Sequence, residues 1–456
     1  MTVLTYILVA SVFLGTQILD IQLGVAKLSV YRLIIGILCI LFLVLVKNND
    51  SRIKLFRNKL SNYYTGFYVF WFVYAVISII WSQDIVGWLK SVFFIGTGTL
   101  SILFIVFFIT KKKELIKLYF ILFLMIMMHN FIGWCEILFG TYWFADLNKL
   151  DKYSTFDSQP MTRIPISIYA NQNDYATMLA LGFFILLILF LYQKNKYLKT
   201  SYLAIMFSSI YLIWRTQSRA NLLGLLLGIG VMFIVKFGPY IKEVLMIKSI
   251  QKLVVTLGLL TAISLLFMDP IQEMILTILT DNRYANVDIS KSKYNRIYLL
   301  LNGLYFLLRT FGVGVGAGNI EYWMEHFSAF PTFGIVNIHN WWGEILVGYG
   351  ILIFTLYISM YFSMFIQLYR QFRISTDRFS KISSLGFMGF LGAFTVSSIS
   401  SSSMMFAEWQ WVLWGCLIAF IKYSEKVNAE SSFTVKKHTN TSIRSRSVKN
   451  GQPDIY

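Results

Sequence analysis

The sequence has little charge, little proline and very little cysteine. Charged residues make up 14% of its 456 residues and proline occurs six times, whereas 57% of the residues are hydrophobic. The mean hydropathy is +0.64. A water-soluble protein cannot bury that much apolar surface. The composition therefore favours an integral membrane protein over a large all-helical soluble core.

Few residues are suited to metal or redox chemistry. Cys39, Cys135 and Cys416 lie within or at the edge of apolar runs, which argues against a disulfide framework and against a cysteine-rich metal site. The chain has no Walker motif, and no inner loop carries the paired aspartates of metal-dependent nucleotide-sugar enzymes. We therefore expect no metal or other cofactor, and no cytoplasmic chemistry driven by ATP or a nucleotide sugar.

Long apolar runs dominate the chain. Runs of about 18 to 22 uncharged residues have the length that crosses a ~30 Å hydrocarbon core as a helix. They predict an all-α polytopic membrane protein with about twelve transmembrane helices. The first run, Val3–Leu23, lacks a charged leading region and a small-residue cleavage site, so we interpret it as a retained span. The expected spans are 3–22, 28–46, 64–82, 87–109, 118–137, 175–192, 201–215, 220–236, 253–268, 339–366, 384–401 and 405–421.

Positive charge is distributed unevenly along this pattern. Lysine and arginine number 40 against 22 acidic residues, and the formal net charge is +18. If the N-terminus is cytoplasmic, the expected inner segments contain 27 of the 40 basic residues. Because basic loops stay on the cytoplasmic side, we expect both termini there, in a multi-pass protein of the cytoplasmic membrane. The excess charge then faces anionic membrane lipids, and nucleic acid is not an expected partner. The inner segments are 47–63, 110–117, 193–200, 236–252, 367–383 and the tail after 421.

The predicted chain has four parts. Residues 1–268 hold the first nine spans and an outer loop at 138–174, residues 269–338 form a large extracellular loop, residues 339–422 hold the last three spans, and residues 423–456 form a disordered basic cytoplasmic tail. Long ordered loops usually carry function, although a spacer without chemistry is the alternative. We therefore expect the active site on the outer face.

The large outer loop contains an apolar stretch with a cation at each end. Ile297–Leu308 is flanked by Arg296 and Arg309 and is too short to span the membrane. It predicts a short interfacial helix whose ends reach toward headgroups or a lipid-linked phosphate, or else a packing helix whose arginines snorkel. The glycine-rich run Gly312–Gly318 follows, and because no βαβ pattern surrounds it, a tight turn is favoured over a nucleotide-binding loop.

One histidine is well placed for proton transfer. Of the four histidines, only His326 and His339 are expected on the outer side. His339 opens a predicted helix, where the positive end of the helix dipole favours a neutral imidazole that can accept a proton. An interfacial hydrogen-bonding role is the alternative. Glu344, deeper in the same helix, is an intramembrane carboxylate that needs a partner.

Two arginines lie at an outer junction between spans. Arg215 and Arg219 oppose the positive-inside bias, so they either snorkel or bind an anion. Their neighbours Gln217 and Ser218 favour an anion site. Together with Arg296, these guanidinium groups suit a substrate that carries a phosphate or pyrophosphate.

Three short sequence motifs lie on the expected outer side. Ser218-Arg219 is followed by Leu223, Arg296 is followed by a turn that runs from Gly314 to Asn319, and His339-Asn340 is followed by Gly350. In these motifs the chain resembles the superfamily of O-antigen ligases and bacterial polysaccharide polymerases, which includes teichuronic-acid-type polymerases.

A fourth segment is similar to the asparagine-rich stretch that precedes a span in that superfamily. It runs from Arg163 to Ala176 and contains Asn171 and Asn173. The motifs together cover residues 160–355. Some ligases have a further glycine where this chain has Ile353, and this departure weakens the resemblance to ligases more than the resemblance to the superfamily.

The resemblance implies a membrane-embedded, GT-C-like glycosyltransferase that inverts configuration without a metal. Its donor and acceptor would be glycans on undecaprenyl pyrophosphate, and other polysaccharide-assembly proteins are expected partners. Arg219 and Arg296, with Arg215, would stabilise the leaving pyrophosphate, and His339 would be the general base. The substrate-binding residues it implies also include Asn340, Asn171 and Asn173.

The resemblance leaves the acceptor open. A polymerase of capsular, O-antigen or teichuronic-acid type is favoured, because a chain rich in Ile, Lys, Asn and Phe is typical of AT-rich genomes, including many Gram-positive bacteria that lack lipopolysaccharide. A ligase that attaches finished glycan to another surface acceptor is the first alternative. A lipid-linked glycan transporter would more often show internal repeats, and no clear two-fold repeat is found. A structural scaffold is the remaining alternative.

Overall fold

The computed structural model describes residues 1–18, 20–23, 26–48, 59–151, 154–245, 292–401 and 404–449. The chain is an all-helical polytopic membrane protein, as predicted. In the described part, eight helices are long and apolar enough to cross a membrane. The helices are α1 (Thr2–Ile18), α2 (Val30–Lys47), α3 (Lys59–Ile77), η2 (Ser78–Ile80), α4 (Ile85–Phe108), α5 (Lys112–Phe139), α6 (Leu147–Leu150), η3 (Pro160–Thr162), α7 (Gln172–Tyr192), α8 (Lys196–Arg215), α9 (Arg219–Leu245), α12 (Ser292–Arg309), α13 (Ile320–His326), α14 (Trp341–Ile374), α15 (Arg378–Ser397), η4 (Met404–Phe406) and α16 (Glu408–Lys449).

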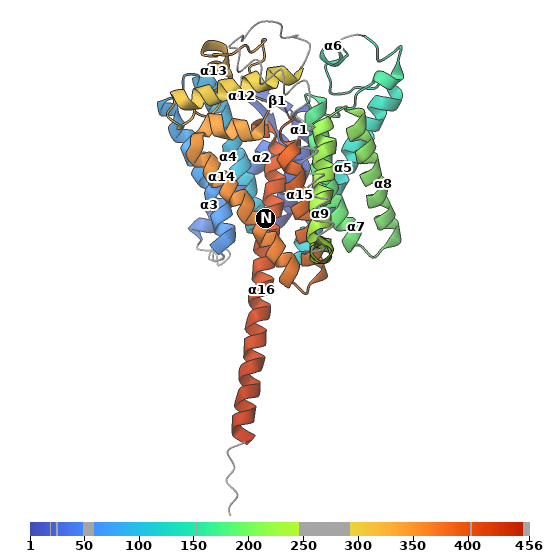
Figure 1. Cartoon of the computed structure of the whole chain (residues 1–456), viewed down its shortest axis with the longest axis vertical. Helices are drawn as coiled ribbons and strands as arrows, with labels where there is room; N and C mark the ends of the chain where they lie inside the picture. Colours follow the sequence, from blue (N-terminus) through green and yellow to red (C-terminus); the bar gives the residue numbers. More distant parts are fainter. Residues whose placement is uncertain are drawn as a thin grey trace, which may run out of the picture.

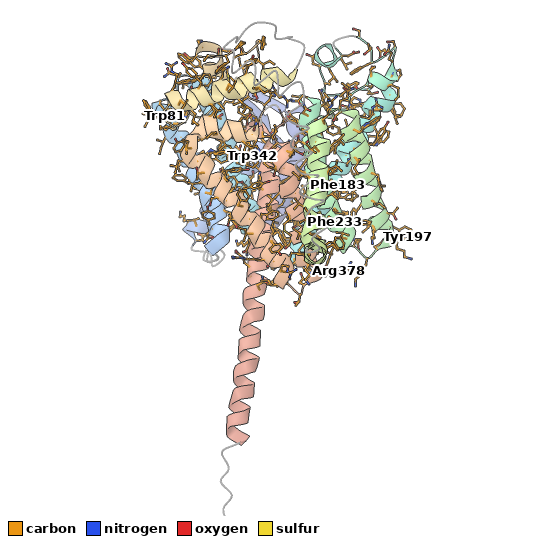
Figure 2. The ribbon with its side chains drawn as sticks, viewed as in Figure 1. Trp81, Phe183, Tyr197, Phe233, Trp342 and Arg378 are labelled. Atoms are coloured by element: carbon orange, nitrogen blue, oxygen red, sulfur yellow. The ribbon has the colours of Figure 1, made fainter. Side chains whose placement is uncertain are left out.

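The helices form an upright bundle with a cap at one end. Helices α12 and α13 lie across that end, and α16 projects from the opposite end (Figure 1). Arg378 and Tyr197 lie at the end away from the cap (Figure 2), where Lys112 of α5 forms an ion pair of 2.7 Å with Asp377. The expected span 253–268 lies outside the described residues, and each of the other expected spans overlaps a described helix. The number of twelve spans and the cytoplasmic position of the termini stay predictions.

The start of the chain differs from the prediction. The expected spans 3–22 and 28–46 place residues 20–22 and 28–29 in helices, but β1 (Asp20–Leu23) pairs antiparallel with β2 (Ala26–Ser29). Helix α1 is interrupted at Gly15, which has φ 63° and ψ −173°. Only glycine adopts this conformation readily, so the break ends the regular helix before the hydropathy pattern does.

The end of the chain also differs from the prediction. Residues 423–456 were expected to be disordered, but α16 continues through Lys449. Between residues 423 and 449 the sequence contains no glycine or proline. A polar segment without these helix breakers can extend a helix that packing has already started.

Buried aromatic rings fix the start of α14 in the centre of the bundle. Trp71 of α3 lies with its ring centroid 5.9 Å from those of Trp341 and Trp411, and these three side chains are fully buried. The Trp341 indole donates to the Tyr357 hydroxyl at 2.9 Å. Trp342, seen below α12 in Figure 2, donates to the Thr395 carbonyl at 3.1 Å. The residues just before α14 are therefore held on a rigid support.

Helix α14 is not continuous. At Gly350, with φ 78° and ψ −179°, the helix breaks, and the segments on either side run in different directions (Figure 1). The glycine turn, residues 312–318 between α12 and α13, fills the break. The Ile351 amide donates to the Gly312 carbonyl at 2.8 Å, and the Val347 carbonyl accepts from the Val315 amide at 2.9 Å. The predicted single span 339–366 is thus two helical segments joined through this turn.

We expect Gly350→Ala to destabilise the protein severely. Its backbone conformation strains any other residue by about 1–3 kcal/mol, and a Cβ there would overlap the carbonyl oxygens of Gly312 and Val313. Thermal unfolding of the detergent-solubilised protein, followed by size exclusion, measures the loss. Gly230→Ala is the matched control, since a Cβ at that position meets no atom within 4 Å. Equal melting temperatures for the two variants would contradict the role of the break.

Candidate active site

The predicted site residues gather at the capped end of the bundle. Helices α7, α9 and α14 begin there, beneath α12 and α13 (Figure 1). The segment 397–401, which follows α15, lies against these helix starts through hydrogen bonds described below. The N-terminal ends of three helices therefore converge on one polar region.

The backbone around His339 is fixed by two asparagines. His339 has a positive φ of 48°, and its amide donates to the Asn337 side-chain oxygen at 2.8 Å. Asn340 caps α14, and its side-chain oxygen accepts from the amides of Trp342 at 3.1 Å and Gly343 at 3.2 Å. The Asn340 side chain thus holds the helix start. A role for it in substrate binding stays a prediction.

The His339 ring is half-buried among charged groups. Burial, followed by the Arg296 guanidinium, lowers the pKa of His339 from its ordinary value of 6.5. A hydrogen bond with the Ser401 backbone and the carboxylates of Asp174 and Glu321 partly oppose this shift. Burial and a neighbouring cation, added to the helix start, therefore favour a neutral imidazole.

Arg296 lies close enough to influence the His339 ring. It belongs to α12 and is half-buried, and burial lowers the pKa of its guanidinium below the ordinary value for arginine. Its Nη1 donates to the Ile399 carbonyl in a long hydrogen bond of 3.4 Å. A guanidinium has five N–H donors, so this carbonyl engages only a small part of the hydrogen-bonding capacity of Arg296. The structure brings Arg296 and His339, which are separated in sequence by the glycine turn and α13, into one site.

Arg219 is the first residue of α9, and its side chain is exposed. Within the described ranges its guanidinium makes no hydrogen bond or ion pair. Its helix start is tied to the site by Asn221, which donates to Ser218 Oγ at 2.9 Å and to Ser400 Oγ at 3.1 Å. Asn221 also donates to the Asn173 carbonyl at 3.3 Å. Arg219 is thus placed beside the segment that contacts His339.

The asparagine-rich segment forms the start of α7. Asn171 caps the helix, with its side-chain oxygen accepting from the amides of Asn173 at 2.9 Å and Asp174 at 3.0 Å. Its amide group donates to Asp174 Oδ2 at 2.7 Å. Asp174 Oδ1 accepts from the Ser401 hydroxyl. Asn171 therefore holds Asp174 toward the site, and the predicted contacts of Asn171 and Asn173 with substrate stay predictions.

Arg215 occupies a different environment from Arg219. It is buried, and its Nη2 donates to the carbonyls of Met161 at 3.0 Å and Arg163 at 2.9 Å. Arg163 in turn donates to the carbonyls of Ile137 at 3.2 Å and Leu138 at 3.0 Å. These arginines fasten the loop before α7 to the ends of α5 and α8. A contact between Arg215 and pyrophosphate stays a prediction.

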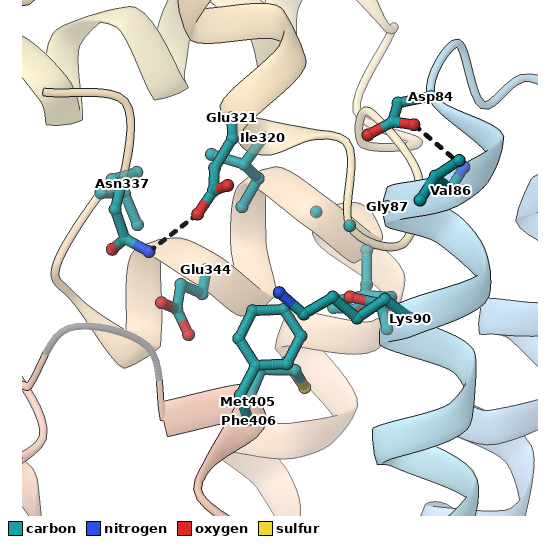
Figure 3. A pocket seen from close by; sticks show the side chains of 15 residues that line it. Asp84, Val86, Gly87, Lys90, Ile320, Glu321, Asn337, Glu344, Met405 and Phe406 are labelled. Atoms are coloured by element: carbon teal, nitrogen blue, oxygen red, sulfur yellow. Dashed lines mark hydrogen bonds between the residues drawn. The ribbon is translucent and has the colours of Figure 1, made fainter. Parts of the chain in front are cut away.

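A cavity of about 250 Å³ lies next to the histidine segment. Figure 3 shows Asp84, which caps α4, and Lys90 of α4 on one side and Glu321, Asn337 and Glu344 on the other. Lys90 is not among the predicted site residues, although the sequence carries a signal for it. It is the single charged residue of the expected span 87–109, and ionisable residues inside a span are commonly functional.

The chain is similar to the teichuronic acid biosynthesis protein TuaE of Bacillus subtilis (strain 168). The two sequences are 29% identical over 420 residues, which cover 91% of this chain and 83% of the relative. The predicted resemblance is thereby confirmed at the level of teichuronic acid biosynthesis. No protein-family model matches the chain.

The ionisation of His339 can be tested without any assumption about activity. Diethyl pyrocarbonate modifies neutral imidazole, so the pH midpoint of modification reports the pKa. Because the pKa of His339 is lowered, we expect a midpoint below 6.5, measured by mass spectrometry of the His339 peptide. Arg296→Gln removes the neighbouring cation and should move the midpoint upward. Arg309→Gln, at the far end of α12, should not. A midpoint above 6.5 in the unmodified protein would contradict the proposed electrostatics.

Proposed function

We propose that the chain is a polymerase of cell-surface polysaccharide. It transfers glycan from undecaprenyl pyrophosphate to a sugar hydroxyl of a lipid-linked repeat at the outer face of the cytoplasmic membrane. The observation that carries this proposal is the placement of Arg296 beside a half-buried His339 whose neutral form is favoured. The similarity to a teichuronic acid biosynthesis protein supports the class of product.

The proposed reaction is a single displacement with inversion. The acceptor oxygen forms a bond to the anomeric carbon as the bond from that carbon to the pyrophosphate oxygen breaks. The proton of the acceptor hydroxyl passes to the His339 ring, and the bonding electron pair leaves with the pyrophosphate. This chemistry therefore needs at least a base, here His339, and a site that binds the pyrophosphate anion.

Arginine is suited to the leaving group. Negative charge grows on the pyrophosphate during bond cleavage, and guanidinium groups in a partly dry site stabilise it strongly. Arg296 provides a half-buried cation and Arg219 provides an exposed one with free donors. Two guanidinium groups supply the charge that a divalent metal supplies elsewhere, so the proposed mechanism is metal-independent.

Carboxylates near His339 stabilise the ring once it has accepted the proton. As the ring accepts the proton it becomes an imidazolium, and the charges of Asp174 and Glu321 favour that form. Ser401, which bonds both Asp174 and the ring, fixes the orientation of the imidazole. In this proposal Ser401 and Asp174 are positioning residues, and His339 is the catalytic base.

We expect His339→Ala to slow transfer by about 10²–10⁴-fold with little change in donor affinity, since a positioned base contributes to the chemical step. Single-turnover rates are measured in reconstituted membranes with purified lipid-linked repeats, EDTA, and no nucleotide. His326→Ala is the control, because His326 is exposed and stacks on Tyr322 with a centroid separation of 4.2 Å.

The same assay separates the proposal from its alternatives. Transfer only to a different surface acceptor would favour the ligase, and absence of transfer in the unmodified protein would overturn both. A strain without the gene should accumulate single lipid-linked repeats, whereas loss of a ligase leaves full-length lipid-linked polymer.

Arg219→Lys and Arg296→Lys should each lose at least ~10-fold in turnover, because lysine keeps the charge but not the bidentate fork that grips a phosphate. Arg309→Lys, whose guanidinium lies over the rings of Tyr305 and Phe327, is the control. Steady-state kinetics on correctly inserted protein measure the effect. Near-normal turnover in the first two variants would show that these arginines only anchor helices.

A further inference from the structure

The cavity beside the histidine segment is directly connected to the proposed base. Asn337 lines it, accepts from the His339 amide at 2.8 Å through Oδ1, and donates to Glu321 at 3.3 Å through Nδ2. Glu321 also influences the ionisation of the His339 ring. His339 itself is not among the described residues that line the cavity, but a molecule there would contact Asn337 and Glu321, which hold and influence His339.

The lining of the cavity suits a sugar. Glu321, Glu344 and Asn337 can accept hydrogen bonds from hydroxyl groups, and Lys90 can donate them. Phe406 adds an aromatic ring to this polar set. A volume of about 250 Å³ is below the range of ~300–1,000 Å³ for pockets that hold drug-sized ligands, so one sugar ring fits better than a longer glycan.

The same lining is unsuited to pyrophosphate. Three acidic side chains, Asp84, Glu321 and Glu344, face a single cation, Lys90. Like charges disfavour an anionic phosphate in this cavity. Phosphate recognition fits the arginine side of the site, where α9 begins with Arg219.

Lys90 is placed to contact a bound sugar. Its ammonium lies 4.6 Å from the centroid of the Phe406 ring. Figure 3 shows it reaching from α4 across the cavity toward the side of Glu344 and Glu321. Within the described ranges Lys90 makes no hydrogen bond or ion pair. The contact with the Phe406 ring orders the Lys90 side chain, and the ammonium group has N–H donors that suit the hydroxyl groups of a sugar.

We propose that this cavity is the acceptor subsite and binds the terminal, non-reducing sugar ring of the acceptor glycan. The proposal rests on the proposed function. Lys90 and Glu321 hold hydroxyl groups of that ring, and the attacking hydroxyl reaches His339 from the Asn337 side. The donor pyrophosphate approaches from the side of Arg219, so His339 lies between the two substrates.

The test measures sugar binding separately from turnover. The probe is the repeat-unit oligosaccharide released from the lipid by mild acid, titrated calorimetrically into the full chain in lipid nanodiscs. We expect Lys90→Ala and Glu321→Gln to weaken oligosaccharide binding by about tenfold or more, because each loses a charge-assisted hydrogen bond. Lys90→Arg should retain binding. Glu325→Gln, on the same helix as Glu321 but outside the cavity, is the matched control.

The outcomes distinguish the subsite from the proposed function. Selective loss of oligosaccharide binding, with an unchanged KM for the lipid-linked donor, supports the subsite. Unchanged binding in Lys90→Ala and Glu321→Gln overturns it, as does an unmodified protein that does not bind the oligosaccharide. If the unmodified protein binds sugar through Lys90 but transfers none, the polymerase function fails and the sugar subsite stands.

Discussion

An exchange of backbone hydrogen bonds at Gly350 determines how the site is assembled. In a continuous helix the Ile351 amide would donate to the Val347 carbonyl. Here the amide donates to Gly312 and the carbonyl accepts from Val315, while the Gly348 carbonyl accepts from the Gly316 amide at 3.0 Å. Unpaired backbone groups in apolar surroundings are costly, so a broken helix in a membrane protein needs such a replacement. Because the glycine turn follows α12 directly, satisfying the break also places α12 over the first half of α14.

That placement brings the catalytic groups together. Arg296 lies near the start of α12, and His339 immediately precedes α14, so the exchange fixes the distance between a proposed phosphate ligand and a proposed base. The glycines are needed for contact as well as for conformation. A Cβ at Gly314 would overlap the backbone of Gly348 and Gly350, and one at Gly318 would overlap that of Gly87 in α4. The glycine turn is therefore an element of the scaffold of the candidate site and not a linker.

Hydropathy and charge predicted much of the fold, but they could not predict this break. Helices α2, α4 and α7 coincide closely with expected spans, because their apolar runs end at polar residues. The run through Gly350 is apolar on both sides, so its hydropathy gives no sign that the helix changes direction. The hairpin after α1 also escaped prediction, although Asp20, Gln22 and Lys27 interrupt the apolar pattern there. Gly350 was recognised only as part of a motif, and its physical role became clear from the backbone angles.

The candidate site was predicted in part. His339, Arg219 and Arg296 stood out because each is an ionisable residue at the expected outer surface. The contact between Asp174 and Ser401 joins positions 227 residues apart, and no local pattern could reveal it. Arg215 and Asn171 were predicted as ligands, and the structure shows that they also hold loop and helix ends. Their contacts with substrate stay predictions.

The charges around His339 also couple its basicity to donor binding. Arg296 lowers the pKa of the free site, whereas Asp174 and Glu321 raise it. Under the proposed function, a pyrophosphate bound at Arg296 would offset the positive charge that disfavours protonation. The carboxylates of Asp174 and Glu321 would then raise the pKa of His339 with less opposition from Arg296. The ring would therefore be a stronger base when the donor is bound. An empty site would hold a weak base, and the same arginine that binds the leaving group would set when His339 is ready to accept a proton.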